Sequence, residues 1–456
     1  MRPYPLAALV VGAALAILPS RVSKGQEPDE PPIIEKPDFS KPPPPKPGEP
    51  PPADGGPNAY VRTPDEVIAF FQERTRRVPA DFISYRYLGE AYERKARERD
   101  DLPSYEKAEQ AFRKAIELLP NYSRAEAGLA AVLCSRHKFA EGLEIANKLH
   151  VREPKNLDAL ATIGDAQFEL GRYDDAEATF AALYKLAPIP EVVARQANLA
   201  ETKGDADRAL ALLGQAAQAA LKKGTAQDTA WYRVRMADVA FQVGKIAEAE
   251  TFYQNVLKDV PEQHDATFGL GLVRQAQGKP DEALALMERA VAIGPDPHML
   301  MALGDLCLLA NRPVEARSQF ARLEQATRGQ SEYLRARSMF FSDHDRDLPE
   351  ALKLAEEDYS QRKDVHGSDA LAWALYKNGK FAEAAKASAD ASKLGTPDAK
   401  IYYHAGLIHR KLGDRAKARE HLARALAINP HFGVGQAADA KKALDALGKD
   451  EPKASR

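Results

Sequence analysis

Three aspartates that alternate along one short segment are the first residues of this chain that could perform chemistry. Asp343, Asp345 and Asp347 lie in SDHDRDLP (342–349), and carboxylates at alternate positions are how calcium-binding loops begin. Such a loop also needs glycine at its sixth position and glutamate at its twelfth, where this chain has Leu348 and Leu354. We therefore predict a solvated loop and no metal site.

Other patterns typical of catalysis are also incomplete. Gly-Lys pairs begin at Gly244, Gly278 and Gly379, but none is followed by the serine or threonine of a phosphate-binding loop. The sequence has no GxSxG, CxxC or HExxH motif. These observations predict a protein that is not an enzyme, with no cofactor and no small-molecule substrate.

Charge and cysteine content exclude further classes. The chain has 64 basic and 66 acidic residues, so it lacks the basic excess typical of nucleic-acid binding. Its two cysteines, Cys134 and Cys307, lie far apart in apolar segments, which favours two buried free thiols over a disulfide.

The N-terminal segment predicts export. Residues 6–18 (LAALVVGAALAIL) form an apolar run that is short for a membrane span but typical of a secretory signal peptide. No clear cleavage site follows, so an uncleaved membrane anchor remains an alternative. Residues 27–57 then contain 13 prolines, which predicts an extended, disordered linker. The expected location is periplasmic or extracellular.

The most regular feature of the chain is a spacing of 34 residues, shown by Pro120, Pro154 and Pro188. Six glycines mark the same repeat, each with a small residue seven places before it and an alanine five places after it. These glycines are Gly171, Gly204, Gly244, Gly278, Gly379 and Gly413. Such a period predicts an array of small units that must stack to bury their apolar faces.

Each unit is predicted to be a pair of antiparallel helices. Apolar residues at three- and four-residue spacing, as in Phe180, Leu183 and Tyr184, give each helix a buried stripe. The glycine allows the left-handed conformation with which the first helix ends. The proline stops the second helix before the next pair begins.

Three segments carry this pattern most clearly, at 163–188, 270–295 and 405–430, and they resemble the tetratricopeptide repeat. The resemblance implies an all-α, right-handed superhelical solenoid of antiparallel helix pairs. Further copies turn at His137 and at Asn311, since asparagine is the usual alternative to glycine in the left-handed region. An early copy at 87–120 has about seven extra residues between its helices.

We predict nine recognisable pairs and a tenth, degenerate one. A capping box that begins at Thr63 opens an unpaired helix before them. The expected organisation is a signal peptide or anchor at 1–25, a linker at 26–58, a first part of the array at 59–323, a degenerate repeat or hinge at 324–365, the last repeats at 366–430, a capping helix at 431–448 and a disordered tail at 449–456.

The resemblance also implies that the first helix of each pair lines a concave wall. Of 24 wall positions in six repeats, eight are acidic, none is Lys or Arg, and both tryptophans of the chain are included. Aromatic anchors flanked by charge are typical of binding hot spots. The predicted partner-binding residues are Asp158, Asp165, Phe168, Trp231, Asp238, Phe241, Phe268, Met301, Asp305, Asp369, Trp373 and Tyr376.

An acidic, aromatic wall predicts partners that present apolar side chains together with Lys or Arg. The main hypothesis is a non-catalytic scaffold or adaptor in the cell envelope, which holds segments of other proteins in this groove. The alternative is a regulatory or specificity subunit that recruits a separate enzyme. Neither hypothesis requires contact with nucleic acid, and contact with a membrane would occur only through an uncleaved N-terminal segment.

Overall fold

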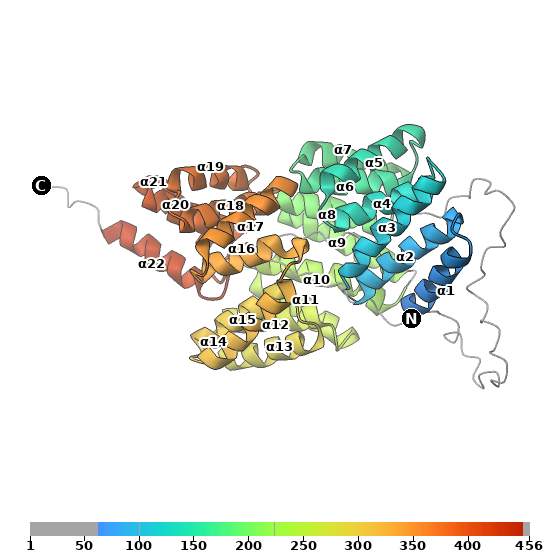
Figure 1. The fold of residues 1–456 in the computed structure, drawn as a ribbon. Coiled ribbons are helices and arrows are strands. Elements are labelled where there is room, and N and C mark those ends of the chain that lie inside the picture. Colours follow the sequence, from blue (N-terminus) through green and yellow to red (C-terminus); the bar gives the residue numbers. More distant parts are fainter. Residues whose placement is uncertain (1–62, 100, 223, 450–456) are drawn as a thin grey trace, which may run out of the picture.

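The computed structural model describes residues 63–99, 101–222 and 224–449, which form 22 α-helices and one short 3-10 helix (Figure 1). The predicted signal peptide or anchor, the proline-rich linker and nearly all of the C-terminal tail lie outside these residues. The first helix, α1 (Pro64–Arg77), begins with the predicted capping box, in which the Thr63 hydroxyl accepts a hydrogen bond from the backbone N–H of Glu66. Ten antiparallel helix pairs follow it in the described part of the chain.

The pairs succeed one another without interruption. The first four are α2 (Phe82–Arg99) with α3 (Pro103–Leu118), α4 (Ser123–Ser135) with α5 (Phe139–Arg152), α6 (Leu157–Glu169) with α7 (Tyr173–Leu186), and α8 (Pro190–Thr202) with α9 (Ala206–Leu221). The next three are α10 (Ala226–Gln242) with α11 (Ile246–Asp259), α12 (His264–Ala276) with α13 (Pro280–Ile293), and α14 (Pro297–Leu309) with α15 (Pro313–Thr327). The last three are α16 (Leu334–Asp343) with α17 (Leu348–Gln361), α18 (Val365–Lys377) with α19 (Phe381–Ser392), and α20 (Ala399–Lys411) with α21 (Arg415–Ile428).

The residues between paired helices have the predicted backbone conformation. All six marker glycines have positive φ, between 71° and 91°, and His137 and Asn311 have φ of 58°. A left-handed residue at this place lets the second helix fold back along the first. The small residue seven positions earlier is equally necessary, because a side chain at Gly164 would collide with the ring of Phe180. The all-α array of helix pairs is therefore confirmed.

Two predictions about irregular repeats need refinement. Gly89 lies against the ring of Phe112 as Gly164 lies against that of Phe180, but with seven more residues between the two. These extra residues do not form a loop, because five of them lengthen α2 to 18 residues and two lengthen α3 to 16 residues, compared with 13 and 14 in α6 and α7.

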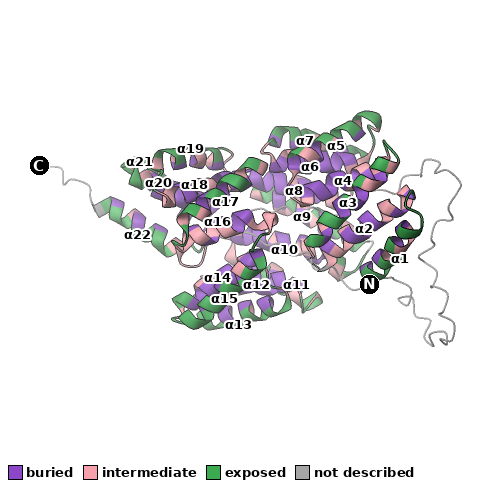
Figure 2. Ribbon diagram, in the orientation of Figure 1, coloured by how far each residue is buried: buried purple, intermediate pink, exposed green. Residues whose placement is uncertain are grey.

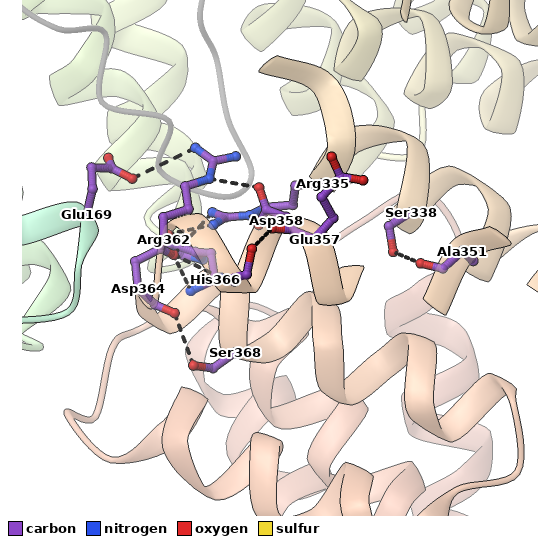
Figure 3. Close-up of polar contacts among 12 residues, drawn as sticks. Glu169, Arg335, Ser338, Ala351, Glu357, Asp358, Arg362, Asp364, His366 and Ser368 are labelled. Atoms are coloured by element: carbon purple, nitrogen blue, oxygen red, sulfur yellow. Dashed lines mark hydrogen bonds and ion pairs between the residues drawn. The ribbon is translucent and has the colours of Figure 1, made fainter. Parts of the chain in front are cut away.

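The degenerate segment forms a complete pair, α16 with α17. Asp345 takes the left-handed position at its turn, with φ of 51°. Ser338 takes the position of the small residue, and its hydroxyl donates a hydrogen bond to the backbone oxygen of Ala351 at 2.8 Å (Figure 3). Asp is among the few residues other than glycine that enter the left-handed region readily, so the pair folds without the usual sequence marker.

The superhelix turns tightly enough for its last repeats to touch its middle repeats, a region we call the closure contact. The backbone N–H of Val365 donates to the hydroxyl of Tyr173, the hydroxyl of Thr396 donates to the Thr202 carbonyl, and Asn429 Nδ2 donates to the Phe241 carbonyl. These partners are 188 to 194 residues apart in sequence. Loops that follow α17, α19 and α21 thus rest on the hairpin turns of the α6, α8 and α10 pairs.

Burial follows this architecture (Figure 2). Buried residues concentrate on the helices of the inner layer, while second helices such as α13 and α21 keep exposed outer faces. The final helix, α22 (Gln436–Lys449), covers the last pair through Ala440, Ala443 and Leu447, as a cap does for a solenoid. Among the described residues, no helix has both the length and the apolar character that a membrane span requires.

Candidate protein-binding groove

The predicted wall residues all lie on first helices. Asp158, Asp165 and Phe168 belong to α6; Trp231, Asp238 and Phe241 to α10; Phe268 to α12; Met301 and Asp305 to α14; and Asp369, Trp373 and Tyr376 to α18. Four of these residues, Asp158, Trp231, Asp305 and Tyr376, are half-buried, and the other eight are buried. Contact of these residues with a partner stays a prediction.

Four of the acidic side chains already have partners within the chain, and one of them is Asp305, whose Oδ1 lies 3.2 Å from Nε2 of His344. Both oxygens of Asp165 accept hydrogen bonds from Arg195 of the next repeat, each at 2.8 Å, and both groups are buried. Asp238 accepts a hydrogen bond from the Tyr253 hydroxyl at 2.6 Å and lies 3.3 Å from Arg235. The expectation of a wall with unneutralised acidic groups is therefore wrong at these positions.

Asp369 is engaged in the same way, because both of its oxygens lie 3.0 Å from Nδ1 of the buried His404. The sequence reasoning missed these basic partners because it considered only four positions per first helix. Arg195 and Arg235 both lie two residues before the small residue of their repeats, Ala197 and Ala237. That shared position is the signal that could have found them.

The two tryptophans differ. Trp373 is 5% exposed, its Nε1 donates to Asp343 at 2.7 Å, and its ring stacks on His404 and Tyr376. The expectation that it faces the hollow of the solenoid is wrong. Trp231 is half-buried against Tyr232, and its Nε1–H is buried with no hydrogen-bond partner.

A second unsatisfied group lies on the neighbouring first helix. The side-chain oxygen of Asn198, on α8, is buried and lacks a hydrogen-bond donor. Asn198 occupies a wall position that the sequence analysis considered but did not select. A donor and an acceptor without partners on successive first helices are uncommon in a folded protein, since buried polar groups are normally satisfied.

A cavity of about 40 Å³ lies where the closure contact meets the inner wall. Its lining includes Asp238, Asp265 and Phe268 from the middle repeats and Lys400 and Phe432 from the last ones. Burial raises the pKa of Asp238 to about 7, although Arg235 and the Tyr253 hydroxyl oppose the shift. Burial likewise raises the pKa of Asp265 to about 7.

A cluster of buried charges joins the closure contact to α6 (Figure 3). Arg335 contacts Asp358 at 2.9 Å and Asp364 at 3.1 Å, while Arg362 contacts Asp358 at 2.9 Å and Glu169 at 3.8 Å. Burial opposes ionisation of Asp364, but the two arginines outweigh it and lower its pKa to about 2. Burial raises the pKa of Glu169 to about 8, and the nearby Asp364 adds to this shift.

The residues that could in principle bind a metal or undergo redox chemistry are engaged in contacts that stabilise the fold or are buried in it. Asp343 accepts from Trp373, Asp345 contacts Lys377 at 2.7 Å, and Asp347 caps α17. No group of three or more potential metal ligands occurs among the described residues. Cys134 and Cys307 are buried and free, and burial raises the pKa of both thiols, which makes them poor nucleophiles.

Comparisons with known proteins place these features in a family. Models of the tetratricopeptide repeat match residues 89–122, 129–189, 161–225, 234–296, 272–331 and 399–432. No curated protein matches the sequence. Similar solved structures include the Cut9–Hcn1 hetero-tetramer of the APC/C, at 13% identity and a TM-score of 0.37, covering 83% of this chain and 92% of that one.

Yeast Tom70 is similar at 14% identity and a TM-score of 0.34, covering 85% of this chain and 92% of its own. The human IFIT1 dimer with PPP-AAAA is similar at 14% identity and a TM-score of 0.42, covering 80% and 86%. Repeat matches along most of the array, together with ten stacked helix pairs in the described residues, establish the family. This chain is a member of the tetratricopeptide repeat family, whose arrays serve as scaffolds for protein–protein interaction.

Proposed function

We propose that this protein is a non-catalytic scaffold of the cell envelope that binds extended segments of other proteins along the wall formed by α8, α10 and α12. The family supports binding of proteins or peptides in general. The choice of wall rests on one observation, the pair of unsatisfied groups at Asn198 and Trp231. An extended peptide offers a backbone carbonyl and an N–H at regular intervals, which are the partners that these two groups lack.

The energetic argument favours a binding role for this pair. A buried donor or acceptor left without a partner costs about 1–3 kcal/mol. A partner segment that satisfies both groups would recover this cost on binding. Trp231 also supplies a large, half-buried ring, the side chain most often found at interface hot spots.

Substitution of Trp231 tests the site with a matched control. Trp231→Phe removes the N–H and keeps an aromatic ring, while Trp231→Ala removes both. Partners would be captured from envelope fractions with wild-type protein and each variant at equal loading. We expect the partner bound by the wild type to be reduced with Trp231→Phe and lost with Trp231→Ala, while circular dichroism shows that both variants remain folded at the assay temperature. Equal capture by all three proteins would contradict the proposal.

Location in the envelope is a separate part of the proposal, and it is supported by the apolar run at residues 6–18. Fractionation of cells followed by mass spectrometry of the N-terminus would test it. Export with cleavage predicts a protein that begins near residue 25 in the periplasm or medium, whereas retention predicts an intact N-terminus in the membrane fraction. An intact N-terminus in the soluble cell interior would contradict export.

A further inference from the structure

The cavity at the closure contact has features that its role in packing does not explain. It measures about 40 Å³, whereas a single water needs roughly 10–15 Å³, so it holds the end of a side chain or a very small ligand. Middle repeats contribute Asp238, Asp265 and Phe268, and the last repeats contribute Phe432. The cavity therefore exists only while the two parts of the superhelix are in contact.

One carboxylate oxygen in this cavity lacks a hydrogen bond. Asp265 is 3% exposed, and its Oδ2 accepts from Gln263 Nε2 at 3.0 Å. Its Oδ1 is buried without a hydrogen bond. The nearest basic atom is Nε2 of His264 at 3.2 Å, but burial lowers the pKa of that imidazole, which favours its neutral form. Asp265 thus has unused capacity to accept a hydrogen bond from a donor in the cavity.

The charges around the cavity are predominantly negative. Arg235 is shared between Asp238, at 3.3 Å, and Glu201, at 2.7 Å. Lys400 is the one basic residue of the cavity lining, and its charge also acts on His298 and Asp305.

The remaining charged neighbours increase this imbalance. Asp296 lies close enough to raise the pKa of Asp265 further. Asp398, which also lines the cavity, caps α20 and lies 3.6 Å from His366. The cavity lining therefore holds three carboxyl groups, Asp238, Asp265 and Asp398, against one basic group, Lys400, and a cation that entered the cavity would reduce this imbalance.

The apolar part of the lining specifies the kind of cation. Phe241, Phe268, Phe432 and the ring of Tyr253 surround the space. Aromatic faces attract positive charge, and aromatic rings combined with carboxylates are a known surrounding for alkylated ammonium groups. Gly269 allows this arrangement, because a side chain there would collide with the Tyr253 ring.

We infer that this cavity binds an alkylammonium group, supplied by a lysine side chain of a partner segment. The inference rests on the proposed function, because it makes the cavity the specificity pocket of the same wall. The ammonium group of lysine is more compact than the planar guanidinium fork, so a cavity of about 40 Å³ favours lysine over arginine. Entry of the cation stabilises the ionised carboxylates, and binding therefore strengthens as the pH rises through 7.

Calorimetry with the purified full chain at pH 8 tests the inference. The probes are N-acetyl-L-lysine methylamide, its neutral analogue N-acetyl-L-norleucine methylamide, and methylammonium chloride. We expect saturable binding of the lysine derivative, at least about tenfold stronger than that of the norleucine derivative. Saturable binding of methylammonium with the same affinity as the lysine derivative would support an ammonium site. It would also identify the ligand as a free amine and not a lysine side chain. Equal affinity for the lysine and norleucine probes would overturn the inference.

Substitutions in the lining test whether the lysine derivative binds in this cavity. Asp265→Asn should weaken binding of the lysine derivative about tenfold, while Asp281→Asn, an exposed position on α13, should have no effect. If Asp265→Asn fails to fold, Phe268→Leu tests the aromatic lining, with the same expected loss. Wild-type affinity in a folded Asp265→Asn or Phe268→Leu protein would refute the site. If the Trp231 variants nevertheless lose the partner that the wild type captures, the proposed function stands and only the pocket fails.

Discussion

Hairpin turns of identical sequence type have different surroundings in two regions of the array. Gly171 and Gly278 both mark a repeat, and their φ values are 71° and 74°. A Cβ atom on Gly278 would meet nothing within 4 Å, whereas one on Gly171 would lie 2.5 Å from the backbone oxygen of Lys363. Gly244 resembles Gly171, since a Cβ there would lie 2.8 Å from the Ile428 oxygen.

This comparison shows that the turn glycine has two roles, which the repeat pattern alone does not distinguish. At Gly278, glycine is needed only for the left-handed backbone that reverses the chain. At Gly171 and Gly244, glycine also allows a backbone from nearly six repeats later to approach. The closure contact therefore uses positions that were already glycine for a local reason, which explains why no additional sequence marker accompanies it.

The largest expected effect concerns the charges beneath the closure contact. Arg335→Ala would leave Asp364 buried without its main counter-charge and Asp358 with Arg362 alone, and such a loss typically costs about 3–5 kcal/mol. The control is Arg233→Ala, which removes a partly exposed pair with Asp259 and should cost no more than about 1 kcal/mol. Urea denaturation followed by circular dichroism measures both. Equal losses would show that the buried cluster contributes no more than a surface pair.

A smaller effect is expected from the turn glycines. Gly278→Ala should cost about 1–2 kcal/mol, the ordinary cost of a side chain in the left-handed region. Gly171→Ala should cost about 1–3 kcal/mol more, because the new methyl group overlaps a backbone oxygen that cannot move independently of its loop. The same urea experiment compares them. If the two variants were equally stable, the closure contact would not be formed in solution.

A third test removes one hydrogen bond between the two parts of the superhelix. Thr396→Val deletes the donor to the buried Thr202 carbonyl and should cost about 1–3 kcal/mol. Thr251→Val removes a hydroxyl that bonds the Ala247 carbonyl of its own exposed helix, and should change stability by less than about 0.5 kcal/mol. X-ray scattering adds a readout of shape, since loss of closure would increase the radius of gyration of Thr396→Val only.

Local features of the fold could be predicted from the sequence, because they depend on residues close together in the chain. Helix pairs follow from three- and four-residue apolar spacing, and their turns follow from left-handed residues at Gly171, Asn311 and equivalent positions. The contact between Thr396 and Thr202 could not be predicted, because it depends on small rotations accumulated over the intervening repeats. No single residue determines this accumulated rotation.

The candidate site could also be predicted only in part: its residues were found, but their burial and their pairing were not. The first helices do carry Trp231, Asp238 and Phe268, as periodicity and the family resemblance implied. The burial of Asp238 and Phe268 could not be predicted, because both line the cavity that the last repeats close. The neutralisation of Asp165 depends on Arg195 in the next repeat, a pairing that becomes visible only when adjacent first helices are placed side by side.

The smallest expected effect, when it is measured over a single pH unit, is a dependence of stability on pH through Glu169. Burial raises the pKa of this carboxyl from an ordinary 4.5 to about 8, so the folded protein keeps a proton that the unfolded chain releases above pH 4.5. This contribution to stability is fully present below pH 4.5 and is lost as the pH rises towards 8, by about 1 kcal/mol between pH 5 and pH 6.

Glu169→Gln imitates the protonated group and should flatten that part of the profile of stability against pH. Glu177→Gln, at an exposed position on α7, is the control and should leave the pH dependence unchanged. A Glu169→Gln profile that still falls with the wild-type slope would show that Glu169 is ionised in the folded protein and pairs with Arg362 as a charged group.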